Sequence, residues 1–319
     1  MMKRALLLLS LLAVPCVVTS YMAEAAPNTD AAAPGTDAAT ASPLDKLCKL
    51  LKLYGYSDAE IKIFRAGYTG DTATLENLKD KNHIGIYCFG AAATGNKELV
   101  LQCLDKGADP NAGLDGAAEG GHMNIVQLML DKGAHPNSGL KGAAEGGHME
   151  IVQLMLDKGA DPNAGLEGAA EGGHMDIVQL MLSKGADPDD GLWDAAENGY
   201  MEIVQLLLSK GADPDWGLEG AVRGGHMDIV RLLLSKGATN YVSGLIGAAY
   251  GGHMEIVQLM LDKGAAPDWG LEGAVRGGHM DIVQLLLSKG ATDLDSALEA
   301  AEYNGHTECA EFIRAAMKK

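Results

Sequence analysis

The sequence has few aromatic and few basic residues. Only 3 Trp, 9 Tyr and 3 Phe occur among 319 residues, so we do not expect a large aromatic-lined cofactor pocket. The 25 Lys and Arg residues face 43 Asp and Glu residues, which gives a net charge of -18. A surface this negative repels the phosphate backbone of nucleic acids. The composition therefore predicts no nucleic-acid partner.

The sequence also lacks the short patterns that mark common enzymes and metal sites. It contains no G-x-S-x-G, no H-E-x-x-H, no P-loop and no C-x-x-C pair. We therefore predict a protein that is not an enzyme, with no catalytic residues, no cofactor and no metal site. An enzyme with an unrecognised site is the least favoured alternative.

Cysteines are few and irregularly spaced. Beyond the first 25 residues there are four, Cys48, Cys88, Cys103 and Cys309, all in apolar surroundings. Buried free thiols are the favoured interpretation. A disulfide between Cys88 and Cys103 is the alternative if the protein reaches an oxidising compartment.

The N-terminal region is typical of an exported protein. Two basic residues precede the mainly apolar, uncharged stretch 5–19, and Ala23-Glu24-Ala25 fits a cleavage site, so we expect residues 1–25 to be a signal peptide. Residues 26–42 are rich in Ala, Pro and Thr and predict a disordered tether. No later segment is apolar enough to span a membrane. We expect a soluble, monomeric protein, secreted or periplasmic.

The folded part is expected to begin with two helices and a degenerate capping repeat in residues 43–86. Ser42 and Pro43 fit an N-cap and a first helical position. Ser57 and Glu60 fit a capping box at the start of the next helix. The last segment, 297–319, fits a C-terminal capping repeat with a more polar helix.

Between these caps, residues 87–296 contain eight repeats of one unit. The units begin at Tyr87, Gly113, Gly139, Gly165, Gly191, Gly217, Gly244 and Gly270; the sixth and eighth carry one extra residue beyond the usual 26. A period of this length indicates a solenoid, in which each unit buries its apolar face only by stacking on its neighbours.

The unit that begins at Gly139 shows the expected local structure. Leu140, Ala143 and Ala144 predict a short first helix whose small residues allow close packing. A Gly pair ends it, and the apolar residues of 149–156 predict a second helix. Gly159 is expected to terminate that helix and Pro162 to prevent its continuation. The sequence therefore predicts an all-α fold of stacked helix-turn-helix units.

The recurring pattern G-H-M-[DE]-I-V-Q-L-[LM]-L-x-K-G-A-D-P-N resembles the ankyrin repeat over about residues 58 to 319. The resemblance implies an α-solenoid whose surface binds other proteins. Ankyrin repeats are normally 33 residues long and open their first helix with T-P-L-H, whereas these units have GLDG or GLEG there. The projecting hairpin is shortened accordingly, and the resemblance does not extend to it.

Two positions of the repeat hold residue types that can bind metals; we call them the His column and the Met column. The seven recurring His residues are His122, His148, His174, His226, His253, His279 and His306, and a Met follows the turn in seven units. Stacked helix pairs lie about 8 to 10 Å apart, too far for consecutive units to share one metal with ligands near 2 Å. We expect the His column to act structurally in the turn and the Met column to pack in or near the core.

The third and seventh positions of each unit share one face of the first helix and vary. Early units carry carboxylates there, including Glu119, Glu145 and Glu171, which we interpret as a solvated acidic face. Later units carry aromatic and Arg residues there, and Trp216, Tyr241 and Trp269 are expected at nearby loop positions. The candidate partner-binding residues are Trp193, Trp216, Arg223, Tyr241, Ile246, Tyr250, Trp269 and Arg276. Trp, Tyr and Arg are enriched in binding hot spots.

The alternative for this set is structural: Arg223 with Glu219 and Arg276 with Glu272 would form i,i+4 ion pairs, and the loop Trp residues would cover the shortened hairpin. The favoured function is a non-enzymatic, exported scaffold for protein-protein interaction with an unidentified partner. A dedicated inhibitor or immunity protein for one enzyme or toxin is the alternative.

Overall fold

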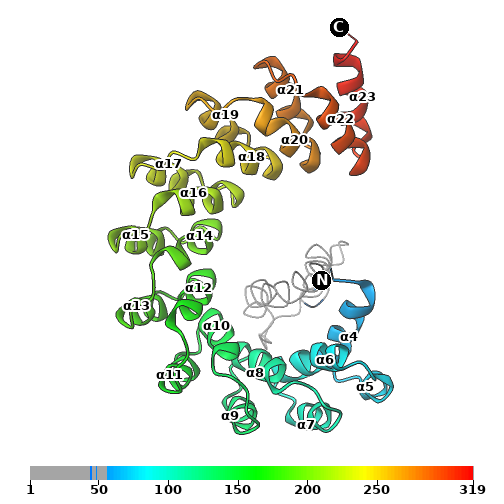
Figure 1. Cartoon of the computed structure of the whole chain (residues 1–319), viewed down its shortest axis with the longest axis vertical. Coiled ribbons are helices and arrows are strands. Elements are labelled where there is room, and N and C mark those ends of the chain that lie inside the picture. The colour runs from blue at the N-terminus through cyan, green and yellow to red at the C-terminus, as the bar shows by residue number, and fades with distance from the viewer. Residues whose placement is uncertain (1–43, 45–47, 49–55, 319) are drawn as a thin grey trace, which may run out of the picture. The chain divides into compact units, whose positions relative to one another are not determined.

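A computed structural model describes Leu44, Cys48 and residues 56–318 of the chain. The predicted signal peptide (1–25) and tether (26–42) lie outside the described residues. The described residues divide into two compact units, one ending at Ala186 and the other beginning at Asp187. The described part of the chain consists of helices joined by turns and short loops, without strands, which confirms the predicted all-α fold of repeated helix pairs (Figure 1).

The described residues of the first unit form five helix pairs, and the residues predicted to form a degenerate repeat make up the first of these pairs. Its first helices are α4 (Asp58–Thr69), α6 (Lys81–Ala93), α8 (Pro110–Glu119), α10 (Asn137–Glu145) and α12 (Pro162–Gly172). Its second helices are α5 (Thr72–Asn77), α7 (Lys97–Asp105), α9 (Met123–Asp131), α11 (Met149–Asp157) and α13 (Met175–Ser183). First helices pack on first helices of adjacent repeats and form one layer.

The second unit repeats this arrangement. Its first helices are α14 (Asp189–Glu197), α16 (Pro214–Arg223), α18 (Tyr241–Gly251), α20 (Asp268–Gly277) and α22 (Leu294–Tyr303). Its second helices are α15 (Met201–Ser209), α17 (Met227–Ser235), α19 (Met254–Asp262), α21 (Met280–Ser288) and α23 (Thr307–Ala316). Within this unit the first and second helices again form two layers (Figure 1).

The helix boundaries follow from local sequence. The capping box of Ser57 and Glu60 starts α4, as predicted. Asp161 caps α12 by accepting from Asn163 N at 3.0 Å, and Pro162 is the first residue of that helix rather than only a stop after α11. Gly159 has φ of +88°, a left-handed conformation that favours glycine after the end of α11. The predicted first helix begins earlier than Leu140, at Asn137.

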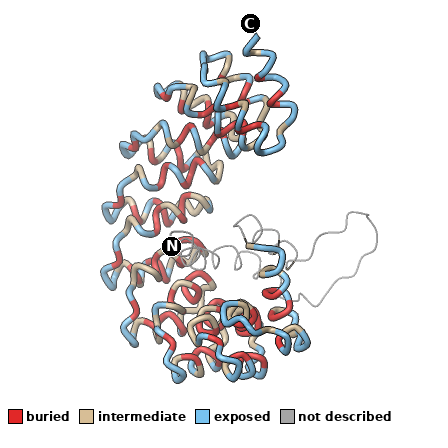
Figure 2. Tube along the Cα trace, turned by 45° about the vertical axis from the view of Figure 1, so that its right-hand side comes forward, coloured by how far each residue is buried: buried red, intermediate tan, exposed pale blue. Residues whose placement is uncertain are grey.

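Successive repeats contribute the same positions to the core. In α10 and α11 the buried side chains include Leu140, Ala143, Ile151 and Met155. Buried positions recur in the same places in successive repeats (Figure 2). The Met column, represented by Met149, is half-buried at the start of seven second helices, α9, α11, α13, α15, α17, α19 and α21. Its expected packing at the edge of the core is thus confirmed.

The His column links neighbouring repeats. His148 Nε2 lies 2.9 Å from the backbone oxygen of Glu119 in the preceding first helix, and His226 Nε2 lies 2.8 Å from that of Glu197. A neutral imidazole donates this bond through its Nε2-H. The bond satisfies a carbonyl near the end of a helix, where no intrahelical donor remains. The predicted structural role of the column is confirmed.

The repeat that begins at Gly191 differs from those on either side of it. Asp194 stands where the adjacent repeats have Gly168 and Gly220, and Tyr200 replaces the recurring His. This is also the first repeat of the second unit. The division of the chain therefore coincides with a repeat whose packing residues are unlike those of its neighbours.

Candidate functional site

All eight predicted partner-binding residues lie on first helices of the second unit. They are Trp193 in α14, Trp216 and Arg223 in α16, Tyr241, Ile246 and Tyr250 in α18, and Trp269 and Arg276 in α20. These four helices follow one another in the layer, with α16 packed between α14 and α18. The sequence-predicted set therefore belongs to one helical layer.

Four of these residues present apolar surface to solvent. Trp216 is 62% exposed, Trp269 58%, Tyr250 52% and Ile246 39%. Trp216 and Trp269 occupy equivalent repeat positions in α16 and α20, in the first turns of these helices. The prediction that Trp216, Tyr241 and Trp269 lie in loops is wrong, because Asp213, Asn240 and Pro267 are the N-caps and the helices begin before or at the aromatic residues.

Trp193 and Arg223 contact each other rather than standing free. The guanidinium carbon of Arg223 lies 5.9 Å from the centroid of the Trp193 ring, within range of a cation–π interaction. Arg223 Nε is also 3.4 Å from the Glu197 carboxylate. The expected i,i+4 pair of Arg223 with Glu219 is replaced by this pair between repeats. Trp193 is half-buried and contributes less free surface than Trp216 or Trp269.

Two ion pairs, Arg223 with Glu197 and Arg276 with Glu272, lie partly exposed on this helical layer. Burial raises the pKa of Glu197, and the nearby charge of Arg223 partly offsets the effect. Arg276 forms the expected i,i+4 pair with Glu272, at 2.7 Å. Both Arg residues are more than half exposed, so the ion pairs can be exchanged for contacts with a partner at small cost.

The sequence interpretation missed an exposed aromatic residue on the next first helix. Tyr303 in α22 is 90% exposed and follows the seventh-position column of Arg223, Tyr250 and Arg276. Counting repeat positions through the capping repeat would have found it. We define the aromatic surface of the second unit as Trp216, Ile246, Tyr250, Trp269 and Tyr303.

The early carboxylates do not form the solvated acidic face that the sequence suggested. Glu119 is 3% exposed and Glu145 is 1% exposed, and Glu171 is also buried. Lys141 pairs with Glu167 at 2.6 Å and lies 3.8 Å from Glu171. That interpretation was wrong because the seventh position faces packed surface in the first unit.

Burial controls the protonation of this cluster. Burial raises the pKa of Asp115 to about 7, against the opposing charge of Lys141. Glu119 has a pKa well above its usual value, mainly from burial and also from the charges of Asp115 and Glu171. Within the described part of the chain, neither carboxyl oxygen of Glu119 has a hydrogen-bond partner. A proton on Glu119 removes the uncompensated charge.

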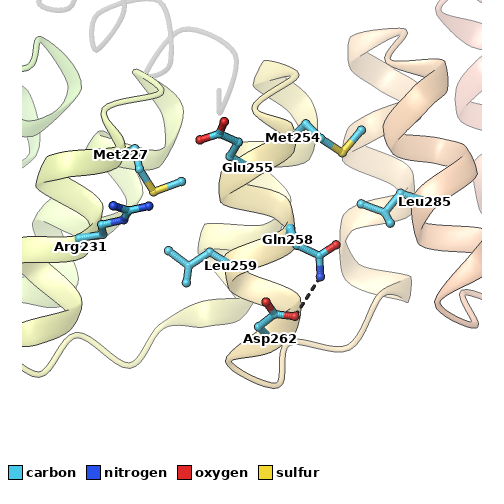
Figure 3. A pocket seen from close by; sticks show the side chains of 8 residues that line it. All are labelled: Met227, Arg231, Met254, Glu255, Gln258, Leu259, Asp262 and Leu285. Carbon is cyan, nitrogen blue, oxygen red and sulfur yellow. Dashed lines mark hydrogen bonds between the residues drawn. The ribbon is translucent and has the colours of Figure 1, made fainter.

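A shallow groove of about 440 Å³ lies on the second helices of the second unit (Figure 3). Its lining residues are Met227, Arg231, Met254, Glu255, Gln258, Leu259, Asp262 and Leu285. Gln258 Nε2 donates to Asp262 Oδ1 at 2.9 Å, and the lining side chains are exposed or half-buried. Such an open groove differs from the enclosed pockets with convergent polar groups that hold most small ligands.

Two further observations bear on cofactors and membranes. Among the residues that the structure describes, no group of three or more His, Cys, Asp or Glu side chains is arranged to hold a metal ion. None of the described helices has the length and apolar character needed to cross a bilayer.

Comparison with known families identifies the repeat. A profile described as ankyrin repeats (3 copies) matches three overlapping segments, residues 88–166, 142–217 and 166–244. No curated protein matches the chain. The matched segments cover helices α7 to α17 completely and include four of the eight candidate residues, Trp193, Trp216, Arg223 and Tyr241.

Proposed function

The chain belongs to the ankyrin repeat family, and we propose that it binds a protein partner through the aromatic surface of its second unit. Ankyrin repeats indicate a scaffold for protein-protein interaction, and such proteins are typically non-enzymatic. The observation that supports the site is the exposure of Trp216 and Trp269 at equivalent positions of two repeats, with Tyr250 on the helix between them.

Exposed Trp and Tyr side chains keep large apolar surfaces in contact with water, and a partner that buries these surfaces gains free energy. Trp and Tyr have large apolar faces at low conformational entropy, which makes them frequent anchors of interfaces. Scattered exposed apolar residues need no explanation. Here, however, Trp216, Ile246, Tyr250 and Trp269 belong to three consecutive first helices of one layer.

The carboxylates near the aromatic surface indicate which charges a partner would carry. Glu219 is exposed on α16, and Glu272 of α20 is half-exposed in its pair with Arg276. The whole chain carries a net charge of -18. We propose a partner that offers apolar side chains for the aromatic residues and basic side chains for the carboxylates, since complementary charges speed association and reject wrong partners.

Capture by the full chain, followed by mass identification and binding measurements with the purified partner, tests this function. The variant Trp216→Ala/Tyr250→Ala/Trp269→Ala should lose at least tenfold in affinity, because truncation of one hot spot often costs about 2 kcal/mol. Leu101→Ala/Phe312→Ala removes exposed apolar residues outside the surface and is the control. Unchanged binding by the triple variant would contradict the proposal.

The stoichiometry of the complex separates a scaffold from the alternative, an inhibitor or immunity protein. One tight partner whose activity stops on binding would favour the inhibitor. Several weaker partners would favour the scaffold. Catalytic turnover that persists in highly purified protein would favour the enzyme alternative instead.

We further propose that the protein acts in the periplasm or outside the cell, after removal of residues 1–25. The support is the sequence of the N-terminus alone. Expression of the full chain in a secreting host should yield protein that begins at Ala26, detected by N-terminal sequencing. Retention of Met1 on protein that remains inside the cell would contradict export.

A further inference from the structure

One repeat differs from the others in a pair of core residues. The seven following full repeats place a buried Leu in the first helix and a buried Met or Leu in the second. These pairs are Leu114/Met129, Leu140/Met155, Leu166/Met181, Leu192/Leu207, Leu218/Leu233, Leu245/Met260 and Leu271/Leu286. The repeat that begins at Tyr87 has Cys88 and Cys103 at these two positions. Both members of the pair are cysteine in the same repeat.

The two cysteines lie on the paired helices of that repeat. Cys88 is in α6 and Cys103 is in α7, and neither has exposed surface. Their thiols are hydrogen-bonded to each other. Cys309, by contrast, lies in α23 of the second unit. Cys88 and Cys103 therefore face each other inside one repeat.

Among the described residues, no basic side chain is a cause of the shift in the Cys88 pKa, whereas a nearby cation or a helix N-terminus activates catalytic thiols. The hydrogen bond with Cys103, followed by burial, raises the pKa of the Cys88 thiol. Tyr87 lies beside Cys103 and donates its hydroxyl to the Asp71 backbone oxygen at 3.0 Å. In the closed repeat the Cys88 thiol is thus protonated, and both thiols are shielded from solvent.

We propose that Cys88 and Cys103 form an intramolecular disulfide in an oxidising environment and so link α6 to α7. The oxidant is a small-molecule or protein disulfide. One cysteine attacks it as the thiolate, breaks its S–S bond, releases one thiol of the oxidant and forms a mixed disulfide. The second cysteine then attacks the protein sulfur of this mixed disulfide, forms the Cys88–Cys103 bond and releases the other thiol of the oxidant. The two thiols lose two protons and two electrons in all, and the oxidant leaves as two thiols.

Access of the oxidant requires the repeat to open, because α6 packs between α4 and α8 and both thiols are buried. A repeat contacts only its neighbours and can open locally at a lower cost than unfolding of the whole chain. Oxidation proceeds before this repeat closes during folding, or when it opens. The bond then closes a short loop and restricts further opening.

Peptide mapping of the full chain tests the linkage directly. The chain is reduced, refolded in a mixture of reduced and oxidised glutathione, acid-quenched and alkylated. Trypsin separates the cysteines into peptides Asn82–Lys97 and Glu98–Lys106. The expected product is these two peptides joined, two hydrogens lighter than their sum. Separately alkylated peptides, or Cys88 joined to Cys48 or to glutathione, would overturn the proposal.

Hydrogen exchange distinguishes a disulfide from ordinary core packing. Amides of α6 and α7 should exchange on the order of 10- to 100-fold more slowly in oxidised than in reduced protein, since the bond closes a loop of about 15 residues. Cys309→Ser should keep this difference. Cys88→Leu/Cys103→Met copies the core pair of the next repeat and should fold yet show no redox dependence. Equal exchange in oxidised and reduced unaltered protein would also overturn the proposal.

Discussion

The guanidinium of Arg223 in α16 lies over the Trp193 ring in α14, with 5.9 Å between the guanidinium carbon and the ring centroid. The same guanidinium approaches the Glu197 carboxylate, four residues after Trp193, at 3.4 Å. Arg223 therefore joins two adjacent repeats of the second unit by two contacts. Arg276, at the equivalent position of α20, pairs with Glu272 of its own helix.

This difference predicts unequal effects of two similar substitutions. Arg223→Ala should lower the free energy of unfolding of the second unit by about 1 kcal/mol, from an exposed cation–π contact and a partly exposed ion pair. Arg276→Ala should lower it by no more than about 0.5 kcal/mol, the value of a helical i,i+4 pair. Urea denaturation measures both values. An equal or larger loss for Arg276→Ala would show that the contacts of Arg223 do not couple the repeats.

The buried carboxyl of Glu119 predicts an unusual pH dependence. Its raised pKa means that the folded protein binds a proton more readily than the unfolded chain does. The contribution of this group to stability therefore falls as the pH rises from its ordinary pKa, about 4.3, toward the folded value. The Glu119→Gln variant has no carboxyl to titrate at this position. Its free energy of unfolding, relative to that of the unaltered protein, should therefore increase between about pH 4 and pH 7.

The measurement is thermal unfolding of both proteins across that pH range. Burial also raises the pKa of Asp115, to about 7, so the contribution of Asp115 to stability likewise falls as the pH rises. Asp115→Asn should therefore show the same trend up to that pH. Glu150→Gln changes an exposed carboxylate on α11 and is the control. A constant difference between Glu119→Gln and the unaltered protein at every pH would contradict the prediction.

The bond between His148 and the Glu119 backbone oxygen predicts a local defect on its removal. His148→Ala loses the 2.9 Å contact and leaves a carbonyl near a helix end without this donor, which should cost about 1 to 2 kcal/mol. Each repeat contacts only its neighbours. Hydrogen exchange should therefore rise mainly in α8 to α11. An equal rise throughout the first unit would indicate that one shared core, rather than adjacent pairs, carries the stability.

The sequence predicted the helix pairs well because their causes are local. Caps, left-handed glycines and apolar spacing recur in each unit, and each acts within a few residues, as at Ser57 or Gly159. The placement of Trp216 in a loop failed although a local signal was present: Asp213 followed by Pro214 is an N-cap and a first helical position.

The site was less predictable because its contacts join residues one repeat apart. The spacing of four residues favoured a pair of Arg223 with Glu219, whereas the structure pairs it with Glu197, 26 positions away. Burial of Glu119 likewise depends on what packs on its helix face. The seventh position holds buried Glu119 in one unit and exposed Tyr250 in the other, so the repeat pattern alone cannot assign its environment.

Close packing between first helices predicts opposite effects of one substitution at two helical glycines. A Cβ at Gly116 in α8 would overlap the backbone oxygen of Phe89, which cannot move without shifting α6. A Cβ at Gly85 in α6 would meet only the Ala112 Cβ, at 3.8 Å, an ordinary contact. Gly116→Ala should therefore destabilise the first unit by about 1 to 3 kcal/mol through overpacking. Gly85→Ala should stabilise it by about 0.5 to 1 kcal/mol, because alanine loses less backbone entropy in a helix.

Denaturant unfolding of the two variants beside the unaltered protein measures both signs in one experiment. The residue change and the secondary structure are the same at both sites, so helix propensity favours alanine equally in each. Any difference in sign comes from the distance between neighbouring first helices. If Gly116→Ala also stabilised the protein, the helices would be farther apart than the structure places them, and the role of glycine in bringing α8 against α6 would have to be abandoned.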